Sequence, residues 1–183
     1  MAGNTRVDSA IGFRLMTLMY WVRDLLQDPR RILDTAQLGE GMKVADYGCG
    51  PGSFTIPAAQ IVGDGGRVYA IDIHPLAISS VRDRASKKGL RNVEAILVRG
   101  YDTGIEASSV DRVLLIDTIH RIEDTDALFR EIRRILKPDG LLFMHKGHMS
   151  MSEQRELVEK SGLFEVMESQ DLTILAAPRA QAS

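Results

Sequence analysis

The sequence predicts an α/β protein built around a doubly wound, mostly parallel sheet of seven strands. Short apolar runs alternate with amphipathic segments from residue 41 onward, which is the pattern of successive βα units covered on both faces. A glycine-rich loop follows the first apolar run, and acidic residues follow most of the next ones. The chain of 183 residues is long enough for one such domain and short for two.

The expected strands are the apolar runs themselves. They are Lys43–Tyr47, Arg67–Ile71, Val93–Val98, Val110–Ile116, Leu141–Met144, Phe164–Glu168 and Thr173–Ala177. Only a polar turn separates the last two, so one of them should run antiparallel to the rest.

Amphipathic helices are expected between the strands. They are Phe54–Val62, Pro75–Lys88 and Asp124–Leu136. The segment Lys137–Gly140 contains Pro and Gly, and it predicts a helix stop followed by a turn. Ser150 and Glu153 have the spacing of a capping box, which predicts a fourth helix through Ser161.

Residues 1–40 are expected to form a helical extension in front of a domain that comprises residues 41–183. One broad apolar face is formed by Ile11, Leu15, Leu18, Val22 and Leu25. A helix over Ile11–Leu26 could dock on the sheet, close as a lid over an apolar substrate, or form a homodimer contact.

The composition limits the classes of partner and the compartment. The net charge of −2 gives no excess of basic residues that would favour binding to DNA or to an anionic membrane. The single cysteine, Cys49, fits a reducing compartment, and neither a signal peptide nor an apolar span is visible. These features predict a cytoplasmic protein without a membrane span.

The loop from Asp46 to Gly52 has glycines at alternate positions, which allows backbone to approach a nucleotide-like ligand closely. Asp46, Asp72, Asp102 and Asp117 all follow apolar runs, so they should line the same edge of the sheet. Asp72 lies 20 residues after Gly52, a spacing suited to a ribose contact.

Carboxylates accept hydrogen bonds from hydroxyls and amines and attract cations, whereas a pyrophosphate prefers a loop free of negative charge. The loop also reads G-x-G-x-G, without the spacing of a dinucleotide fingerprint. S-adenosylmethionine carries a nucleoside, an amino group and a positive charge but no phosphate. It therefore fits this acidic edge better than NAD.

Several segments, in this order, resemble those of the class I S-adenosylmethionine-dependent methyltransferases. They are Val44–Gly52, Tyr69–Ile73, Ser109–Val113, Asp117–His120 and Arg134–Gly140. The resemblance extends over residues 40–178 and implies a Rossmann-like fold with S-adenosyl-L-methionine as cofactor.

The resemblance also implies a set of cofactor-binding residues. They are Asp46, Gly48, Cys49, Gly50, Gly52, Asp72, Ile73, Tyr101, Asp102 and Asp117. Asp46 and the glycine loop would hold the methionine portion. Asp72 would take the ribose hydroxyls, with Ile73 packing on the adenine. Either Asp102 or the Tyr101 backbone would meet the adenine amino group, and Asp117 would line the sulfonium side.

Simpler roles remain open for these residues. The glycines could serve a turn without a ligand, and Cys49 could be small for packing. Asp72 could cap the helix at Pro75, Asp102 could form an Asx turn, and Asp117 could cap a helix.

Three histidines, His120, His145 and His148, follow the fourth and fifth strands and are the predicted catalytic residues. A neutral imidazole at that edge could remove a proton from the acceptor, although polar or surface positions are the alternative. Their ligand type would also allow the three histidines to bind zinc, but the spacings typical of zinc sites are absent, so no metal is expected. His74 is expected to start a helix.

The predicted function is in-line methyl transfer from S-adenosylmethionine to a small-molecule acceptor that could be apolar. The alternatives are a non-catalytic S-adenosylmethionine-binding or interaction protein, an NAD-dependent oxidoreductase, and a methyltransferase acting on RNA or protein. An amino-methylase of DNA would carry a D/N/S-P-P-Y/F motif where this chain has Asp117–His120.

Overall fold

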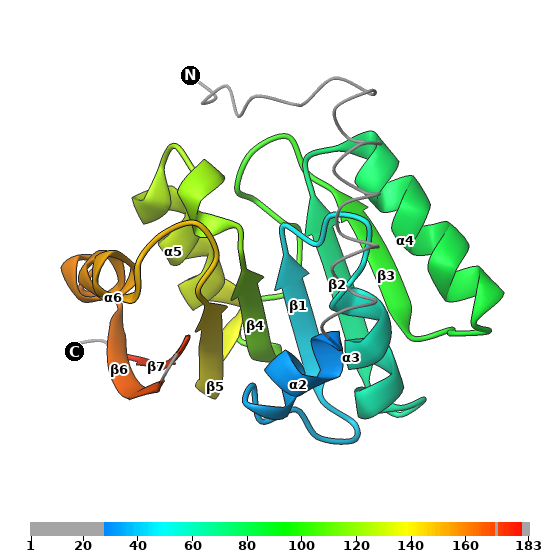
Figure 1. The fold of residues 1–183 in the computed structure, drawn as a ribbon, viewed down its shortest axis with the longest axis horizontal. Coiled ribbons are helices and arrows are strands. Elements are labelled where there is room, and N and C mark those ends of the chain that lie inside the picture. Colours follow the sequence, from blue (N-terminus) through cyan, green and yellow to red (C-terminus); the bar gives the residue numbers. More distant parts are fainter. Residues whose placement is uncertain (1–27, 171, 181–183) are drawn as a thin grey trace.

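The apolar runs form one seven-stranded sheet in the order β3-β2-β1-β4-β5-β7-β6, in a computed structural model that describes residues 28–170 and 172–180 (Figure 1). The strands are β1 Lys43–Tyr47, β2 Arg67–Asp72, β3 Val93–Leu97, β4 Val110–Ile116, β5 Leu136–His145, β6 Phe164–Gln170 and β7 Thr173–Pro178. Strands β1 to β5 pair in parallel, and β7 is antiparallel to both of its neighbours. The predicted Rossmann-like sheet with one antiparallel C-terminal strand is confirmed.

Local capping signals determine where the helices begin. The helical elements are α2 Pro29–Asp34, α3 Thr55–Val62, α4 Pro75–Lys87, the 3-10 helix η1 Ile119–Arg121, α5 Thr125–Ile135 and α6 Met151–Lys160. The Asp124 carboxylate caps α5 by accepting from the Ala127 N–H, and Ser150 and Glu153 form the predicted capping box of α6. His74 caps α4 with its ring nitrogen, which confirms its expected place at a helix start.

Side chains alternate between the two faces of the sheet, and helices cover both faces. In β4, Val113 and Leu115 pack in the same core cluster as Ile132 of α5. Leu114 and Ile116, which point the other way, share a cluster with helices α2 and α3. Burial on both faces explains why the strands read as continuous apolar runs in the sequence.

The segment Lys137–Gly140 differs from the prediction, because it belongs to strand β5 instead of a turn before it. Pairing passes from Val110–Leu136 directly to Arg112–Leu141, so four residues of β5 lie opposite Asp111 alone. The Lys137 ammonium also lies 2.6 Å from the Asp111 carboxylate. The Pro-Gly signal therefore marks a bulge within the strand, and the predicted start at Leu141 was too late.

The chain reverses its direction of travel across the sheet between β1 and β4. It proceeds from β1 through β2 to β3 on one side, and then through β4 and β5 on the other. The carboxyl ends of β1, β4 and β5 point to the same edge, at the top of Figure 1. This reversal creates the crevice in which open α/β sheets bind ligands.

The predicted helix over Ile11–Leu26, with its docking, lid and homodimer alternatives, lies outside the described residues. Helix α2 lies within the predicted extension, and its Asp28-Pro29 start is a cap signal that sequence analysis did not use. None of the helices in the described part of the chain has the length and apolar character needed to cross a bilayer.

Candidate functional site

The loop after β1 turns through glycine conformations and is tied to the end of β2. Gly48 has a φ of 77°, and a Cβ there would meet the Thr118 side chain that follows β4. The N–H groups of Gly48 and Cys49 donate to the Ile71 carbonyl at 2.8 and 3.0 Å. Glycine is therefore required at position 48 both by its backbone angle and by the close approach of the loop after β4.

Asp46 lies beneath this loop and has only 2% of its surface exposed. Its Oδ2 accepts a 2.5 Å hydrogen bond from the Thr55 hydroxyl at the start of α3. Burial raises the pKa of Asp46 to about 7, with a further rise from the Asp72 charge, although the Thr55 hydrogen bond opposes it. A positively charged ligand nearby would favour the ionised carboxylate.

Asp72 joins the glycine loop to the start of α4. Its Oδ2 accepts from the Gly50 N–H at 2.9 Å, and its Oδ1 accepts from the His74 N–H at 2.8 Å. Burial raises the pKa of Asp72 even though both backbone hydrogen bonds lower it. Because His74 is the cap of α4, the structure does not give Asp72 that role. Ile73, the predicted adenine contact, is partly buried beside it.

The loop after β3 contains Asp102 in an Asx turn, since its Oδ1 accepts from the Gly104 N–H at 2.9 Å. Tyr101 is fixed from two sides. Its carbonyl accepts from the Tyr47 hydroxyl at 3.1 Å, and its own hydroxyl accepts from the Asp124 N–H at 2.9 Å. The Tyr101 backbone is thus held against the end of β1.

An ion pair between a buried glutamate and an exposed arginine, which sequence analysis missed, supports the same loop. Glu131 of α5 is 8% exposed and accepts from both the N–H and the hydroxyl of Thr103, at 2.9 and 2.5 Å. Arg134 lies 2.7 Å from the same carboxylate. The only sequence signal is an acid and an arginine three residues apart, which is common on exposed helix faces.

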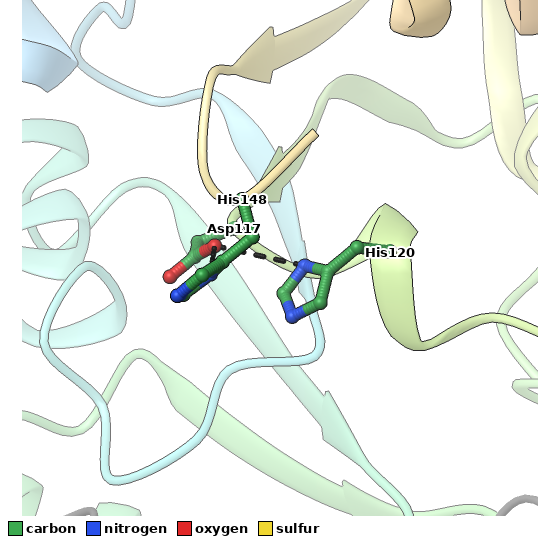
Figure 2. A group of neighbouring side chains, drawn as sticks. All are labelled: Asp117, His120 and His148. Atoms are coloured by element: carbon green, nitrogen blue, oxygen red, sulfur yellow. Dashed lines mark hydrogen bonds and ion pairs between the residues drawn. The ribbon is translucent and has the colours of Figure 1, made fainter. Parts of the chain in front are cut away.

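Three of the predicted residues meet at the ends of β4 and β5, as Figure 2 shows. The Asp117 Oδ1 lies 3.0 Å from Nδ1 of His148 and 3.6 Å from Nδ1 of His120. The two imidazole rings are 4.8 Å apart, centre to centre. The third predicted catalytic histidine, His145, is the last residue of β5 and lies outside this cluster, paired in the sheet with Ile116 and Thr173.

The Asp117 backbone has an unusual conformation, with a φ of 52°. Such left-handed angles are costly for residues other than glycine and concentrate at functional sites. The loop after β5 rests directly on this residue, because a Cβ at Gly147 would collide with the Asp117 carboxylate. Thr118, not Asp117, is the cap residue of η1.

The edge therefore has two chemically different parts. Carboxylates of β1 and β2 lie beside the glycine loop, where hydroxyls, amines and a cation could bind. Imidazoles lie beyond β4, where burial lowers the pKa of His120 despite the opposing charge of Asp117, so that its neutral form is favoured. Cys49 is buried and its pKa is raised by burial, which opposes a nucleophilic role.

Comparisons with known proteins agree on one family. Residues 38–175 match the family described as a methyltransferase domain. Nocamycin O-methyltransferase of Saccharothrix syringae is 35% identical over 111 residues, which are 61% of this chain but only 40% of that protein.

Solved structures show the same likeness. A SAM-dependent methyltransferase from Aquifex aeolicus has a TM-score of 0.79 at 26% identity, over 86% of this chain and 93% of that one. Coclaurine N-methyltransferase, solved with N-methylheliamine and SAH, has a TM-score of 0.57 at 27% identity, over 64% of this chain and 33% of that one. With its glycine loop and acidic sheet edge, the chain belongs to the class I S-adenosylmethionine-dependent methyltransferases, the family whose methyl donor is S-adenosylmethionine.

Proposed function

We propose that this protein transfers a methyl group from S-adenosylmethionine to a small-molecule acceptor. The observation that carries the proposal is the Asp72 carboxylate at the end of β2, which accepts from the Gly50 N–H beside the reversal point of a methyltransferase fold. Each carboxylate oxygen accepts one backbone hydrogen bond and retains capacity for a ribose hydroxyl.

The cofactor would lie across the carboxyl ends of β1 and β2. Asp72 would bind the ribose, and Ile73 would pack against the adenine. The Tyr101 backbone or Asp102 would meet the adenine amino group. The glycine loop over Asp46 would hold the methionine portion, which carries positive charge.

The chemical step requires little from the protein beyond alignment, because the cofactor already carries an activated methyl group. The acceptor atom attacks the methyl carbon in line, the carbon–sulfur bond breaks, and the sulfur keeps the electron pair. An acceptor that arrives protonated must also lose that proton. Holding the reactants in line supplies much of the acceleration.

His120 and His148 are the histidines best placed to accept such a proton, ahead of His145 within β5. Nδ1 of His148 contacts Asp117, which orients the ring and leaves Nε2 as the atom that could take the proton. Asp117 would then serve as the orienting group on the sulfonium side. Turnover unchanged across pH in both alanine variants would remove this role.

A small-molecule acceptor is supported by the relatives, which are named for methylation of nocamycin and coclaurine. The nearly neutral charge of the chain adds no support for an RNA acceptor. We also propose a cytoplasmic location, because a lone buried cysteine suits a reducing compartment.

Calorimetry with S-adenosylmethionine, S-adenosylhomocysteine and NAD tests the proposal. Binding of both sulfur nucleosides, followed by methyl transfer to a member of a small-molecule panel, is the expected result. Binding of NAD alone would contradict it. Tight binding of the nucleosides without transfer to any acceptor would favour a non-catalytic binding protein.

A further inference from the structure

The cluster of Asp117, His120 and His148 has the composition and spacing of a metal site. Each residue offers one ligand atom, and the three atoms all lie within 4.8 Å of one another. The Asp117 Oδ1 is the shared point, at 3.0 Å from one imidazole nitrogen and 3.6 Å from the other. In Figure 2 the two rings approach this oxygen from different segments, His120 from η1 and His148 from the loop after β5.

These separations are close to what a bound ion imposes. Zinc binds nitrogen and oxygen at about 2.0–2.2 Å in tetrahedral geometry, which sets its ligand atoms roughly 3.3–3.6 Å apart. The 3.6 Å distance from Asp117 to His120 lies at the upper end of that range, and the 3.0 Å distance from Asp117 to His148 lies below it. All three ligand atoms lie within 4.8 Å of one another, so the side chains would have to move closer together to bind one ion.

The backbone holds the cluster in place. Asp117 adopts its positive φ at the end of β4, and His120 follows within one turn of η1. His148 comes from the loop after β5, which approaches Asp117 at Gly147 too closely for any side chain there. Strain of this kind persists where the surrounding structure enforces it, and it often accompanies a functional role.

One side of the cluster is open. The exposed fraction of the side chain is 15% for Asp117, 27% for His120 and 76% for His148. Three protein ligands with an open side describe a catalytic metal centre, whereas structural zinc sites are closed by four protein ligands.

We propose that Asp117, His120 and His148 bind a divalent transition-metal ion of the zinc type and leave a coordination position for an oxygen atom of the methyl acceptor. Two imidazoles and one carboxylate suit zinc better than magnesium, which prefers oxygen ligands throughout. The proposal departs from the expectation of no metal, because the structure brings Asp117, and not His145, beside His120 and His148.

The part of this inference that concerns the acceptor rests on the proposed function. The cluster lies next to the proposed cofactor loop, because the hydroxyl of Thr118, the residue after Asp117, lies 3.5 Å from the Gly48 carbonyl. In this arrangement the imidazoles are metal ligands and do not accept the proton of the acceptor. A hydroxyl group bound to the ion would instead release its proton to solvent more readily. Its oxygen would then bond to the methyl carbon as the carbon–sulfur bond breaks. The products are a methyl ether or ester, S-adenosylhomocysteine and one proton.

The test begins with metal binding alone. The full chain is treated with a chelator and then titrated with Zn²⁺, Co²⁺ and Mg²⁺, with calorimetry for affinity and the visible spectrum of Co²⁺ for coordination. Zn²⁺ and Co²⁺ should bind at one site with much higher affinity than Mg²⁺. Binding of Zn²⁺ no tighter than that of Mg²⁺ would overturn the proposal.

Variants place the site. Zn²⁺ binding should weaken by at least about tenfold in each of His120→Ala, His148→Ala and the conservative Asp117→Asn. Even the loss of a residue that only hydrogen-bonds to a metal ligand reduces metal affinity on this scale. His145→Ala, which removes the histidine at the end of β5, is the matched control and should retain the affinity of the unchanged protein. Equal loss in the control, or no loss in the folded His148→Ala protein, would contradict the assignment.

The open position has its own probe. Acetohydroxamate, an oxygen-donor ligand, should change the Co²⁺ spectrum of the unchanged protein, and an unaltered spectrum would refute acceptor coordination. S-adenosylmethionine affinity is measured in parallel. Absence of cofactor binding with intact Zn²⁺ binding would overturn the proposed function and leave the metal site standing. Cofactor binding without Zn²⁺ binding would overturn the metal site and leave the proposed function standing.

Discussion

The Gly50 N–H donates a 2.9 Å hydrogen bond to the Asp72 carboxylate, and this bond couples the loop after β1 to the end of β2. The two segments proposed to contact the nucleoside are therefore fixed to each other before any ligand arrives. A ligand that binds one segment finds the other already in position, which lowers the ordering cost of binding.

Replacement of Asp72 by alanine should weaken S-adenosylmethionine binding by about 1–3 kcal/mol, the range for hydrogen bonds to a charged group. The variant loses both the proposed ribose contact and the bond from Gly50. Calorimetry measures the change. Asp83→Ala, at an exposed position of α4, is the control and should bind normally. A folded Asp72→Ala protein with unchanged affinity would remove the ribose role.

Replacement of Gly48 by alanine should destabilise the protein and weaken cofactor binding together. The new methyl group would collide with Thr118, and the backbone angle of 77° would be strained as well. Gly89→Ala separates these effects, because Gly89 has a φ of 66° and no atom within 4 Å of an added Cβ. Denaturant unfolding should show a loss of about 1 kcal/mol for Gly89→Ala and more for Gly48→Ala. An equal loss in both would mean that contact with Thr118 is unimportant.

The free energy of unfolding of the cofactor-free protein should fall as the pH rises from about 4 to about 7. Burial raises the pKa of Asp46 from 3.8 to about 7 in the folded state, so the folded chain holds a proton there that the unfolded chain releases. Asp72 has a raised pKa as well and acts in the same direction. Thermal unfolding across this window should show a shallower slope for Asp46→Asn.

Cofactor binding should itself release protons in the same window, because a positively charged ligand favours the ionised carboxylates. Calorimetry in two buffers with different ionisation enthalpies measures that release. An identical binding enthalpy in both buffers would contradict the proposed contact between the cation and the acidic edge.

Replacement of Glu131 by glutamine should lower the free energy of unfolding by about 1–3 kcal/mol, because a buried charge partner of Arg134 and Thr103 is lost. Burial alone would raise the pKa of Glu131, but the hydrogen bonds from Arg134 and Thr103 outweigh it and hold the pKa below 4.5. This stabilisation is therefore present above about pH 4.5 and is lost as the pH falls through the folded-state pKa.

Glu159→Gln is the matched control for this change. It breaks an ion pair with Arg155 of 2.8 Å in which both side chains are about half exposed. Such pairs contribute at most about 1 kcal/mol. A Glu131→Gln variant no less stable than this control would show that the network around Thr103 is dispensable.

Much of the fold could be predicted because its signals are local. The Asp124 cap and the Ser150–Glu153 capping box each act within one helical turn, and strands buried on both faces appear as apolar runs. The bulge at Lys137–Gly140 could not be predicted. Its Pro and Gly are also turn residues, and only pairing with β4 shows that the strand continues through them.

In the candidate site, too, the features set by strand order could be predicted and those set by loop paths could not. That Asp72 and Asp117 share an edge follows from strand order, but their contacts depend on loops. His148 meets Asp117 across 31 residues of sequence, and the path of the loop after β5 sets that contact. The role of Glu131 could not be predicted either, because an acid three residues from an arginine is typical of an exposed helix face.

The close packing of Gly147 on Asp117 limits which variants of the loop after β5 can fold. The loops after β4 and β5 touch at this point with no room for a methyl group, so a side chain at position 147 can be accommodated only if Asp117 moves. Libraries that vary residues 146–149 alone should yield mostly misfolded variants wherever position 147 changes. Libraries that retain glycine at 147 and vary the neighbouring positions should keep the contact between the two loops.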